Sequence, residues 1–343
     1  MSKTKLKWKS IIFKQIASVF FAISFFVLYS SCKGSVNTHE NTENELEKQY
    51  SVQGVDFKMI LIEGANATLG SETQSDNKEH TIKLDSYWIG ETEVTQELWQ
   101  AVMKNNPSNF DGSEKKKAEE GEIQAKRPVE RVTWFDAIAF CNELSKKVTN
   151  VGASECVYYN DEAFTNVYTK EDAVGKKAPF VNTAKKGFRL PTEAEWEWAA
   201  RGGENHKWAG TNKETELKKY AWFQGSEFGM QSRSHQVKLK KPNGYGLYDM
   251  SGNVWEWILP VSERRIVLKK AAGDMFILND KYPYSNEKGE NRIKGGSYRS
   301  NKTIEYAVGF VGKFPMKSDD KHKEKWQKKD IGFRLAKTDN NFF

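Results

Sequence analysis

One segment, PNGYGLYDMSGNVWEW from Pro242 to Trp257, constrains the local fold of this chain more than any other. It places two carboxylates, Asp249 and Glu256, around a Ser-Gly-Asn turn and among several large aromatic side chains. Carboxylates spaced around a tight turn, with free backbone carbonyls between them, can form an oxygen cage for a hard cation such as Ca²⁺. In the alternative interpretation the acids cap local backbone N–H groups, and Trp255 and Trp257 belong to the core. The segment by itself is compatible with either.

Further motifs lie on both sides of this segment in a fixed order: ETEVTQELW at Glu91–Trp99, PVERVTW at Pro128–Trp134, GFRLPTEAEWEWAARGG at Gly187–Gly203, RIKGGSY at Arg292–Tyr298 and IGFRLA at Ile331–Ala336. Taken together, the series resembles the formylglycine-generating enzyme, or sulfatase-modifying factor, family. The resemblance runs from about residue 54 to residue 336, which is nearly the whole mature chain. It implies a C-type-lectin-like α+β fold, organised as one domain over residues 54–340 and rich in irregular loops.

The first 31 residues have the features of a targeting segment. Five lysines between Lys3 and Lys14 precede a mostly apolar run from Ile16 to Tyr29, which is too short to span a membrane comfortably. The run ends at Ser-Ser-Cys, and small residues directly before a cysteine are typical of a bacterial lipoprotein signal peptide. We therefore expect cleavage after residue 31, a lipid on Cys32, and a location in the bacterial cell envelope, anchored to a membrane and facing the periplasm or the cell exterior. The alternative is an uncleaved anchor in which the cysteine occurs by chance.

The mature chain is predicted to begin with a flexible tether over residues 32–53, because residues 33–50 are polar, acidic and poor in core-forming side chains. Without the five lysines of the signal segment, the formal net charge falls from +7 to +2. A nearly neutral chain gives no electrostatic argument for binding nucleic acid. The expected partners are a membrane, contacted through the N-terminal lipid, and a protein or glycan ligand.

Three helices are expected from capping patterns and apolar spacing. Thr95 starts a helix that runs to about Lys104. The capping box Thr133–Asp136 starts a second helix, whose buried stripe comprises Ala137, Phe140, Cys141 and Leu144. The box Thr192–Glu195 starts a third, short helix that ends at Gly202.

The resemblance also implies a catalytic apparatus that this chain does not carry. Oxidases of the family use two cysteines, five residues apart and just after the Gly-Gly-Ser motif, to bind copper(I) and activate dioxygen. Counting from Gly295–Ser297, the corresponding positions are Ser300 and Glu305, and no cysteine follows Cys156. A hydroxyl and a carboxylate are hard donors that hold copper(I) poorly, so these positions are interpreted as degenerate and copper is not expected.

Two further cysteines, Cys141 and Cys156, remain after lipidation. In an exported protein they are most simply explained by a structural disulfide. Two separate buried thiols are the alternative, since Cys141 lies on the apolar stripe of the second predicted helix.

For calcium the resemblance is favourable. The family's calcium loop takes a side chain from the position of Asp249, backbone carbonyls from those of Gly252 and Val254, and the carboxylate at the position of Glu256. All four positions carry compatible oxygen donors here, so calcium is the expected cofactor.

Three functions are compatible with these features. In the first, an exported and membrane-anchored lipoprotein uses a non-catalytic domain as a binding or structural module of the cell envelope. Loops 262–290 and 307–329 carry aromatic side chains mixed with Lys and Asp, which suit contact with a protein or glycan but can also fill the loops' own small cores. The second is an enzyme with a different chemistry in the same cleft, which clustered ionisable groups with perturbed pKa values would indicate. The third, a copper-dependent formylglycine-generating oxidase, conflicts with the missing cysteines.

Overall fold

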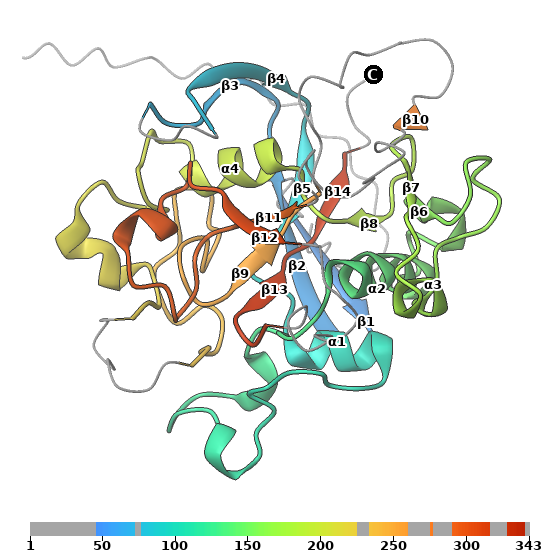
Figure 1. Ribbon diagram of the computed structural model, residues 1–343, viewed down its shortest axis with the longest axis horizontal. Helices are drawn as coiled ribbons and strands as arrows, with labels where there is room; N and C mark the ends of the chain where they lie inside the picture. The colour runs from blue at the N-terminus through green and yellow to red at the C-terminus, as the bar shows by residue number, and fades with distance from the viewer. Residues whose placement is uncertain are drawn as a thin grey trace, which may run out of the picture. The chain divides into compact units, whose positions relative to one another are not determined.

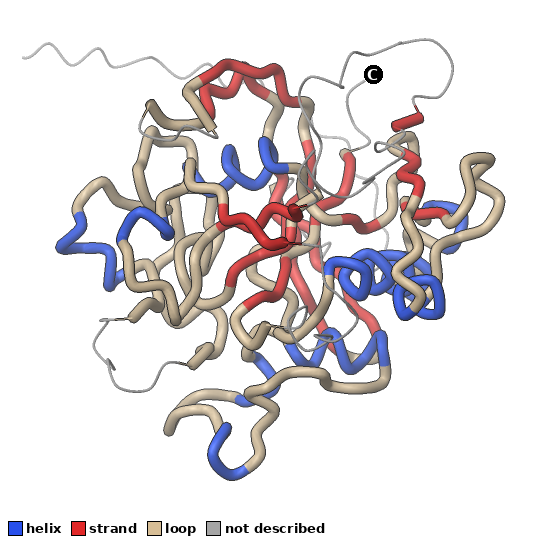
Figure 2. Tube along the Cα trace, in the orientation of Figure 1, coloured by secondary structure: helices blue, strands red, loops and turns tan. Residues whose placement is uncertain are grey.

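The computed structural model describes residues 46–72, 77–224, 233–259, 275–276, 290–315 and 328–339. The predicted signal segment, Cys32 and most of the predicted tether lie outside the described residues. Within the described part, short helices and strands are joined by long stretches of loop (Figure 2). This arrangement confirms the predicted α+β class with abundant irregular backbone.

The largest described sheet has five strands in the order β1-β2-β5-β14-β8, and all neighbouring strands are antiparallel. Its strands are β1 (Glu47–Val52), β2 (Val55–Ile62), β5 (Tyr87–Gly90), β8 (Phe188–Arg189) and β14 (Ala336–Thr338). The last described strand, β14, lies between β5 and β8 (Figure 1). The C-terminal motif is therefore an interior part of a sheet that the N-terminal strands begin.

Strand β1 corrects the predicted boundary of the tether. Residues 47–52 fall within the predicted tether, yet they pair along their whole length with β2. A two-residue turn joins the strands at Gln53 and Gly54, whose φ angles of 51° and 79° suit a tight hairpin. Tyr50 then stacks on Phe57 with ring centroids 5.4 Å apart. The hairpin was not predicted because the segment has a polar composition, and the composition is polar because only one face of β1 is turned to the core.

A second sheet has the strand order β12-β11-β9-β13. It consists of β9 (Trp255–Trp257), β11 (Glu290–Lys294), β12 (Gly312–Pro315) and β13 (Ile331–Phe333). Strand β13 runs parallel to β9, whereas the other pairs are antiparallel. Two smaller sheets, β10-β7-β6 and β3-β4, comprise β3 (Ala65–Leu69), β4 (His80–Leu84), β6 (Tyr158–Tyr159), β7 (Phe180–Asn182) and β10 (Met275–Phe276).

The α-helices of the described part are α1 (Gln96–Met103), α2 (Trp134–Lys147), α3 (Lys170–Val174) and α4 (Glu193–Arg201). The three predicted helices are confirmed, because Thr95, Thr133 and Thr192 cap α1, α2 and α4. Gly202 ends α4 with a φ of 68°. Of the described α-helices, only α3, a short helix that Thr169 caps, was not predicted from the sequence. None of the helices in the described ranges is long and apolar enough to cross a membrane.

Short 3₁₀ helices occur between these elements, at η1 (Glu114–Lys116), η2 (Gln124–Lys126), η3 (Ala153–Glu155), η4 (Glu214–Lys219) and η6 (Thr303–Tyr306). The main hydrophobic core lies where α1 and α2 pack on the sheets. Trp99 of α1 stacks on Phe140 of α2 at 5.1 Å, and Phe333 of β13 packs edge-on against both rings.

The predicted disulfide is wrong, because Cys141 and Cys156 are two free, buried thiols. Cys141 lies inside the main core, whereas the Sγ of Cys156 is directed at the carbonyl oxygen of Asn142, 3.6 Å away. Burial raises the pKa of Cys156 to about 11 and raises that of Cys141 as well. Both thiols are therefore protonated and unreactive near neutral pH, which matches the alternative of two separate buried thiols.

A buried ion pair connects the two larger sheets. Arg334 lies between β13 and β14, which belong to different sheets and follow each other in the red part of the chain (Figure 1). Its Nε and Nη2 donate to the two carboxylate oxygens of Glu256 in β9, at 2.7 and 2.8 Å. Its guanidinium also donates to the carbonyl oxygens of Gly90, at the end of β5, and of Tyr248. The pair therefore aligns both sheets with the segment that contains Asp249.

Candidate functional site

The segment from Asp249 to Glu256 forms a tight loop that few residue types can adopt. Asp249 and Asn253 each have a φ of 57°, and Gly252 has a φ of 90°. A Cβ atom at position 252 would lie 2.3 Å from the carbonyl oxygen of Trp222, so only glycine fits there. Asp and Asn are the non-glycine residues that tolerate positive φ best. The loop conformation thus follows directly from its sequence.

This loop contacts the Gly-Gly-Ser-Tyr motif that follows β11. The N–H of Gly252 donates to the carbonyl of Gly295, and the N–H of Tyr298 donates to the carbonyl of Asn253, both at 2.8 Å. Gly296 has a φ of 75°, and a Cβ atom there would come within 2.5 Å of the ring of Tyr306. Two motifs that are separate in the sequence therefore form one structural unit.

Three buried carboxylates surround one arginine at the inner side of this unit. Glu256 is bonded to Arg334 through both oxygens, and its Oε2 also accepts a hydrogen bond from Trp196 at 2.6 Å. Burial raises the pKa of Asp249 to about 6, and burial together with the charge of Asp249 raises the pKa of Glu93 well above its usual range. The Oδ1 of Asp249 is buried and has no hydrogen-bond partner among the described residues. A cation would neutralise this surplus of buried negative charge.

These contacts allow a test of the predicted calcium ligands. Asp249 fits as an anionic ligand, because one of its oxygens is unpaired and buried. Glu256 is already an ion-pair partner of Arg334, so a calcium ion would have to share that carboxylate. No three His, Cys, Asp or Glu side chains converge as a metal centre within the described residues. The site therefore fits calcium only if the carbonyls of Gly252 and Val254 supply much of its coordination.

An open cleft of about 760 Å³ lies beside the same unit. Ser300 and Glu305 both line it, so the two positions at which the family's oxidases carry cysteines do converge on one cleft. Much of the two aromatic loops predicted to contact a ligand, 262–290 and 307–329, lies outside the described residues. Phe310 is described, and its ring packs against that of Trp255 in the cleft wall, with centroids 6.1 Å apart.

Ser300 is held by its neighbours and, among the described residues, has no partner of the kind that a nucleophile needs. Its Oγ accepts a hydrogen bond from the N–H of Ser297 at 3.2 Å, and its carbonyl accepts one from the hydroxyl of Tyr306. The hydroxyl of Ser297 donates to the Oδ2 of Asp330 at 3.2 Å. No base is hydrogen-bonded to the Ser300 hydroxyl within the described part of the chain, so these contacts do not form a catalytic triad.

Arg131 and Glu130 were missed by the sequence analysis, although both belong to the PVERVTW motif. Arg131 lines the cleft with a φ of 62°, and its N–H donates to the carbonyl of Lys328 at 3.2 Å. Glu130 is fully buried beside it, and its Oε1 accepts a hydrogen bond from the N–H of Phe110 at 2.7 Å. Burial raises the pKa of Glu130 to about 7. The one sequence feature that could have indicated a role for them is the placement of two charged residues between apolar residues of this motif.

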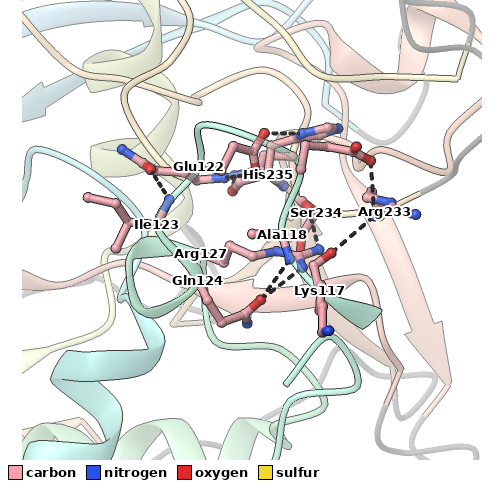
Figure 3. Close-up of polar contacts among 12 residues, drawn as sticks. Lys117, Ala118, Glu122, Ile123, Gln124, Arg127, Arg233, Ser234 and His235 are labelled. Carbon is pink, nitrogen blue, oxygen red and sulfur yellow. Dashed lines mark hydrogen bonds and ion pairs between the residues drawn. The ribbon is translucent and has the colours of Figure 1, made fainter. Parts of the chain in front are cut away.

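A polar network outside the cleft fastens residues 117–127 to residues 233–235 (Figure 3). The Nδ1 of His235 lies 2.7 Å from the Oε1 of Glu122, and Arg127 donates to the carbonyl of Ser234 at 2.5 Å. The N–H of His235 also donates to the Oδ1 of Asn253 at 2.9 Å. The network therefore supports the 249–256 loop from outside. The sequence alone gives no sign of the contact between His235 and Glu122, because the two residues are 113 positions apart.

The family model described as the sulfatase-modifying factor enzyme 1-like domain matches residues 44–339. The chain belongs to this family. The chain is 35% identical over 215 residues to a chaperone protein, LppX, of Paenibacillus barcinonensis, covering 58% of this chain and 70% of that protein. It is 34% identical over 160 residues to the formylglycine-generating enzyme of Bos taurus, covering 44% of this chain and 39% of the enzyme.

Among solved structures, the Treponema denticola variable protein 1 superposes with a TM-score of 0.67 and 41% sequence identity, covering 86% of this chain and 99% of that protein. A structure titled CarF, at 23% identity and a TM-score of 0.55, shares the fold. The family and the fold predicted from the motifs are thereby confirmed.

The raised pKa of Glu130 predicts a specific pH dependence of stability. The folded state retains a proton on Glu130 between its unfolded pKa of about 4.5 and its folded pKa of about 7, so this group stabilises the fold at low pH and the contribution is lost as the pH rises through 7. We expect the melting temperature of wild type, relative to Glu130→Gln, to fall by several degrees between about pH 5 and about pH 8, equivalent to roughly 2 kcal/mol.

Differential scanning calorimetry of both variants across this range measures the effect. Glu216→Gln, which changes a partly exposed acid in η4, is the matched control and should follow the wild-type profile. A constant difference between wild type and Glu130→Gln at every pH would contradict the assignment.

Proposed function

We propose that this protein is a non-catalytic member of its family that binds a ligand in the cleft beside Ser300, as a binding or structural module of the cell envelope. The observation that carries the proposal is that the two oxidase positions converge on one cleft and hold a hydroxyl and a carboxylate. Copper(I) needs soft thiolate ligands, and Ser300 cannot form a mixed disulfide with a substrate cysteine. The fold retains the cleft while the groups for the oxidase chemistry are absent from these positions.

Binding to another protein is the use of the cleft that the relatives favour. One relative is named a chaperone, an activity that requires contact with other proteins, and it matches more than half of this chain. Binding functions are commonly carried by surface loops that a rigid scaffold positions. The cleft here has that construction, because most of its lining residues lie in loops, among them the loop after β11 and the segment before β13.

An enzyme with a different chemistry in the same cleft is the second candidate. Glu130 favours it, because a carboxyl group with a pKa of about 7 is suited to proton transfer near neutral pH. However, Glu130 is not exposed, and one of its oxygens is engaged by the backbone of Phe110. A buried structural acid accounts for these contacts without a reaction, so binding remains the better-supported function.

Anchoring to a membrane through a lipid on Cys32 is a further part of the proposal. The Ser-Ser-Cys sequence after the apolar run supports it, and so does the polar composition of the residues between Cys32 and β1. Such an anchor would hold the domain at a membrane of the bacterial cell envelope, facing the periplasm or the exterior.

The first prediction of the proposed function concerns oxidase activity. The purified domain should neither bind copper(I) tightly nor convert the cysteine of a sulfatase-motif peptide to an aldehyde, because the Ser300 and Glu305 side chains are hard donors. Trapping with a hydrazine probe and mass spectrometry measure the product, with an active formylglycine-generating enzyme as the positive control. Aldehyde formed by the wild-type chain would overturn the non-catalytic assignment.

The second prediction concerns calcium. An ion that binds only the folded state stabilises it by RT ln(1 + [L]/Kd), about 3 kcal/mol at a hundredfold excess over Kd, so chelation should lower the melting temperature by several degrees. Asp249→Ala should abolish the response to chelator, whereas Asp85→Ala, which removes an exposed acid, should retain it. Elemental analysis without calcium, together with a melting curve that chelator does not change, would contradict a calcium site at this loop.

The third prediction concerns the anchor. Expressed in a bacterium with lipoprotein processing, the wild-type chain should partition into the detergent phase and carry an acyl mass on its N-terminal cysteine. Cys32→Ala should remain in the aqueous phase if its signal is cleaved. Equal partitioning of both forms, with no acyl mass on wild type, would contradict lipidation.

A further inference from the structure

The lining of the cleft carries more positive than negative charge. Arg131, Arg299, Lys328 and Lys329 line it, against the carboxylates of Glu305 and Asp330. Asp330 is largely buried and accepts a hydrogen bond from Ser297, so it faces inward more than outward. The predicted mature chain has a formal charge of only +2, so this positive excess is a local property of the cleft.

Two of these cations have no polar partner in the described structure. The guanidinium groups of Arg131 and Arg299 form neither a hydrogen bond nor an ion pair with any described residue. A guanidinium presents several donors in a planar fork that matches a carboxylate. Two guanidinium groups without a polar partner among the described residues are therefore suited to an anionic ligand.

The backbone at Arg131 adds a second, independent observation. Its φ of 62° is a left-handed conformation that a long side chain adopts only at a cost in free energy. Residues held in such conformations cluster at binding and catalytic sites, where the surrounding structure imposes them. Here the imposing contact is the hydrogen bond from the N–H of Arg131 to the carbonyl of Lys328, directly across the cleft wall. A glycine would satisfy the same backbone, so the arginine side chain itself needs an explanation.

The size and lining of the cleft favour a peptide over a sugar. A volume of about 760 Å³ lies within the range of sites that hold a small ligand or a few residues of a chain. Trp255, the aromatic side chain among the described lining residues, is half-buried and packs against Phe310, which limits the ring face available for stacking on a sugar. Asn109 and Asn301 supply amide groups that can pair with a peptide backbone.

We infer that the cleft binds an acidic segment of a protein partner, with Arg131 and Arg299 each receiving a carboxylate. The inference rests on the proposed binding function and names the ligand class of the same cleft. Glu305 limits the affinity of this site, because its carboxylate lies in the same lining as the cations that hold the ligand.

The test uses fluorescent hexaglutamate as the probe and the mature chain as the protein. Fluorescence anisotropy should show binding of hexaglutamate and no binding of hexaglutamine, with affinity that falls between about 0.05 M and about 0.3 M salt. Arg131→Gly and Arg299→Gln should each weaken binding by about fivefold or more, as expected for loss of one charge-assisted pair at a partly exposed site. Glu305→Gln should strengthen it.

A matched control separates loss of a ligand contact from loss of structure. Lys104 at the end of α1 also has a positive φ, 66°, and is exposed outside the cleft lining. Lys104→Gly therefore removes the same charge and relaxes the same backbone conformation. It should leave hexaglutamate binding unchanged. Both glycine variants should melt at or above the wild-type temperature, because each relieves a strained residue.

Several outcomes would overturn the inference. Equal binding of hexaglutamate and hexaglutamine, or equal weakening by Lys104→Gly and Arg131→Gly, would contradict a carboxylate site in the cleft. Hexagalacturonate that binds more tightly than hexaglutamate would assign the cleft to an acidic glycan instead. The aldehyde assay on the same preparation distinguishes a failure of this inference from a failure of the proposed function. If the protein forms no aldehyde and does not bind hexaglutamate, only the inferred ligand class is contradicted.

Discussion

The buried ion pair between Arg334 and Glu256 is the interaction on which the rest of this structure depends. Both side chains are fully buried, and removing one partner of such a pair typically costs roughly 3–5 kcal/mol because the other charge is left uncompensated. Arg334 sits between strands of two different sheets and also bonds the end of β5. The pair thereby sets the position of β9, and β9 carries the end of the 249–256 loop and one wall of the cleft.

The same pair determines the electrostatics of the loop. Burial raises the pKa values of Glu93 and Asp249, and the single positive charge of Arg334 offsets this rise only in part. Buried acids in this state either retain protons or attract a cation. A calcium ion held by Asp249 and the loop carbonyls would satisfy the unpaired Oδ1, which gives the proposed metal a structural role in fixing the loop that supports the cleft.

In the proposed function, the cleft belongs to a family fold that is used for binding rather than for oxidase chemistry. The turn at Gly295 and Gly296, whose φ angles of 93° and 75° favour glycine, comes directly before the segment in which positions 300 and 305 line one cavity. What differs are the side chains at those positions. Ser300 carries a hydroxyl that accepts a backbone hydrogen bond, and the guanidinium groups of Arg131 and Arg299, which have no polar partner among the described residues, line the same cleft. Such a surface is better suited to recognising an anionic partner than to oxidising a cysteine.

Local features of this chain could be predicted from its sequence, because a helix cap or a tight turn depends on residues only a few positions apart. The boxes at Thr133 and Thr192 identified α2 and α4, and the Asp-Met-Ser-Gly-Asn run identified the turned loop. The ordered motifs identified the family and hence the fold. The hairpin of β1 was missed because its signal, a Gln-Gly turn, is weak and its outer face is polar.

Only the tertiary structure decided which side chains meet. The partner of Glu256 is Arg334, 78 positions away, and this contact turns an expected free metal ligand into half of an ion pair. Cys141 and Cys156 are close in sequence, yet the fold buries one in the core and directs the other at a carbonyl, so no disulfide forms. Arg131 reaches the cleft because its backbone is held in a left-handed conformation by the segment before β13. Local patterns encode local geometry, whereas burial, pairing and strain arise from contacts between distant segments, and these exist only once the chain has folded.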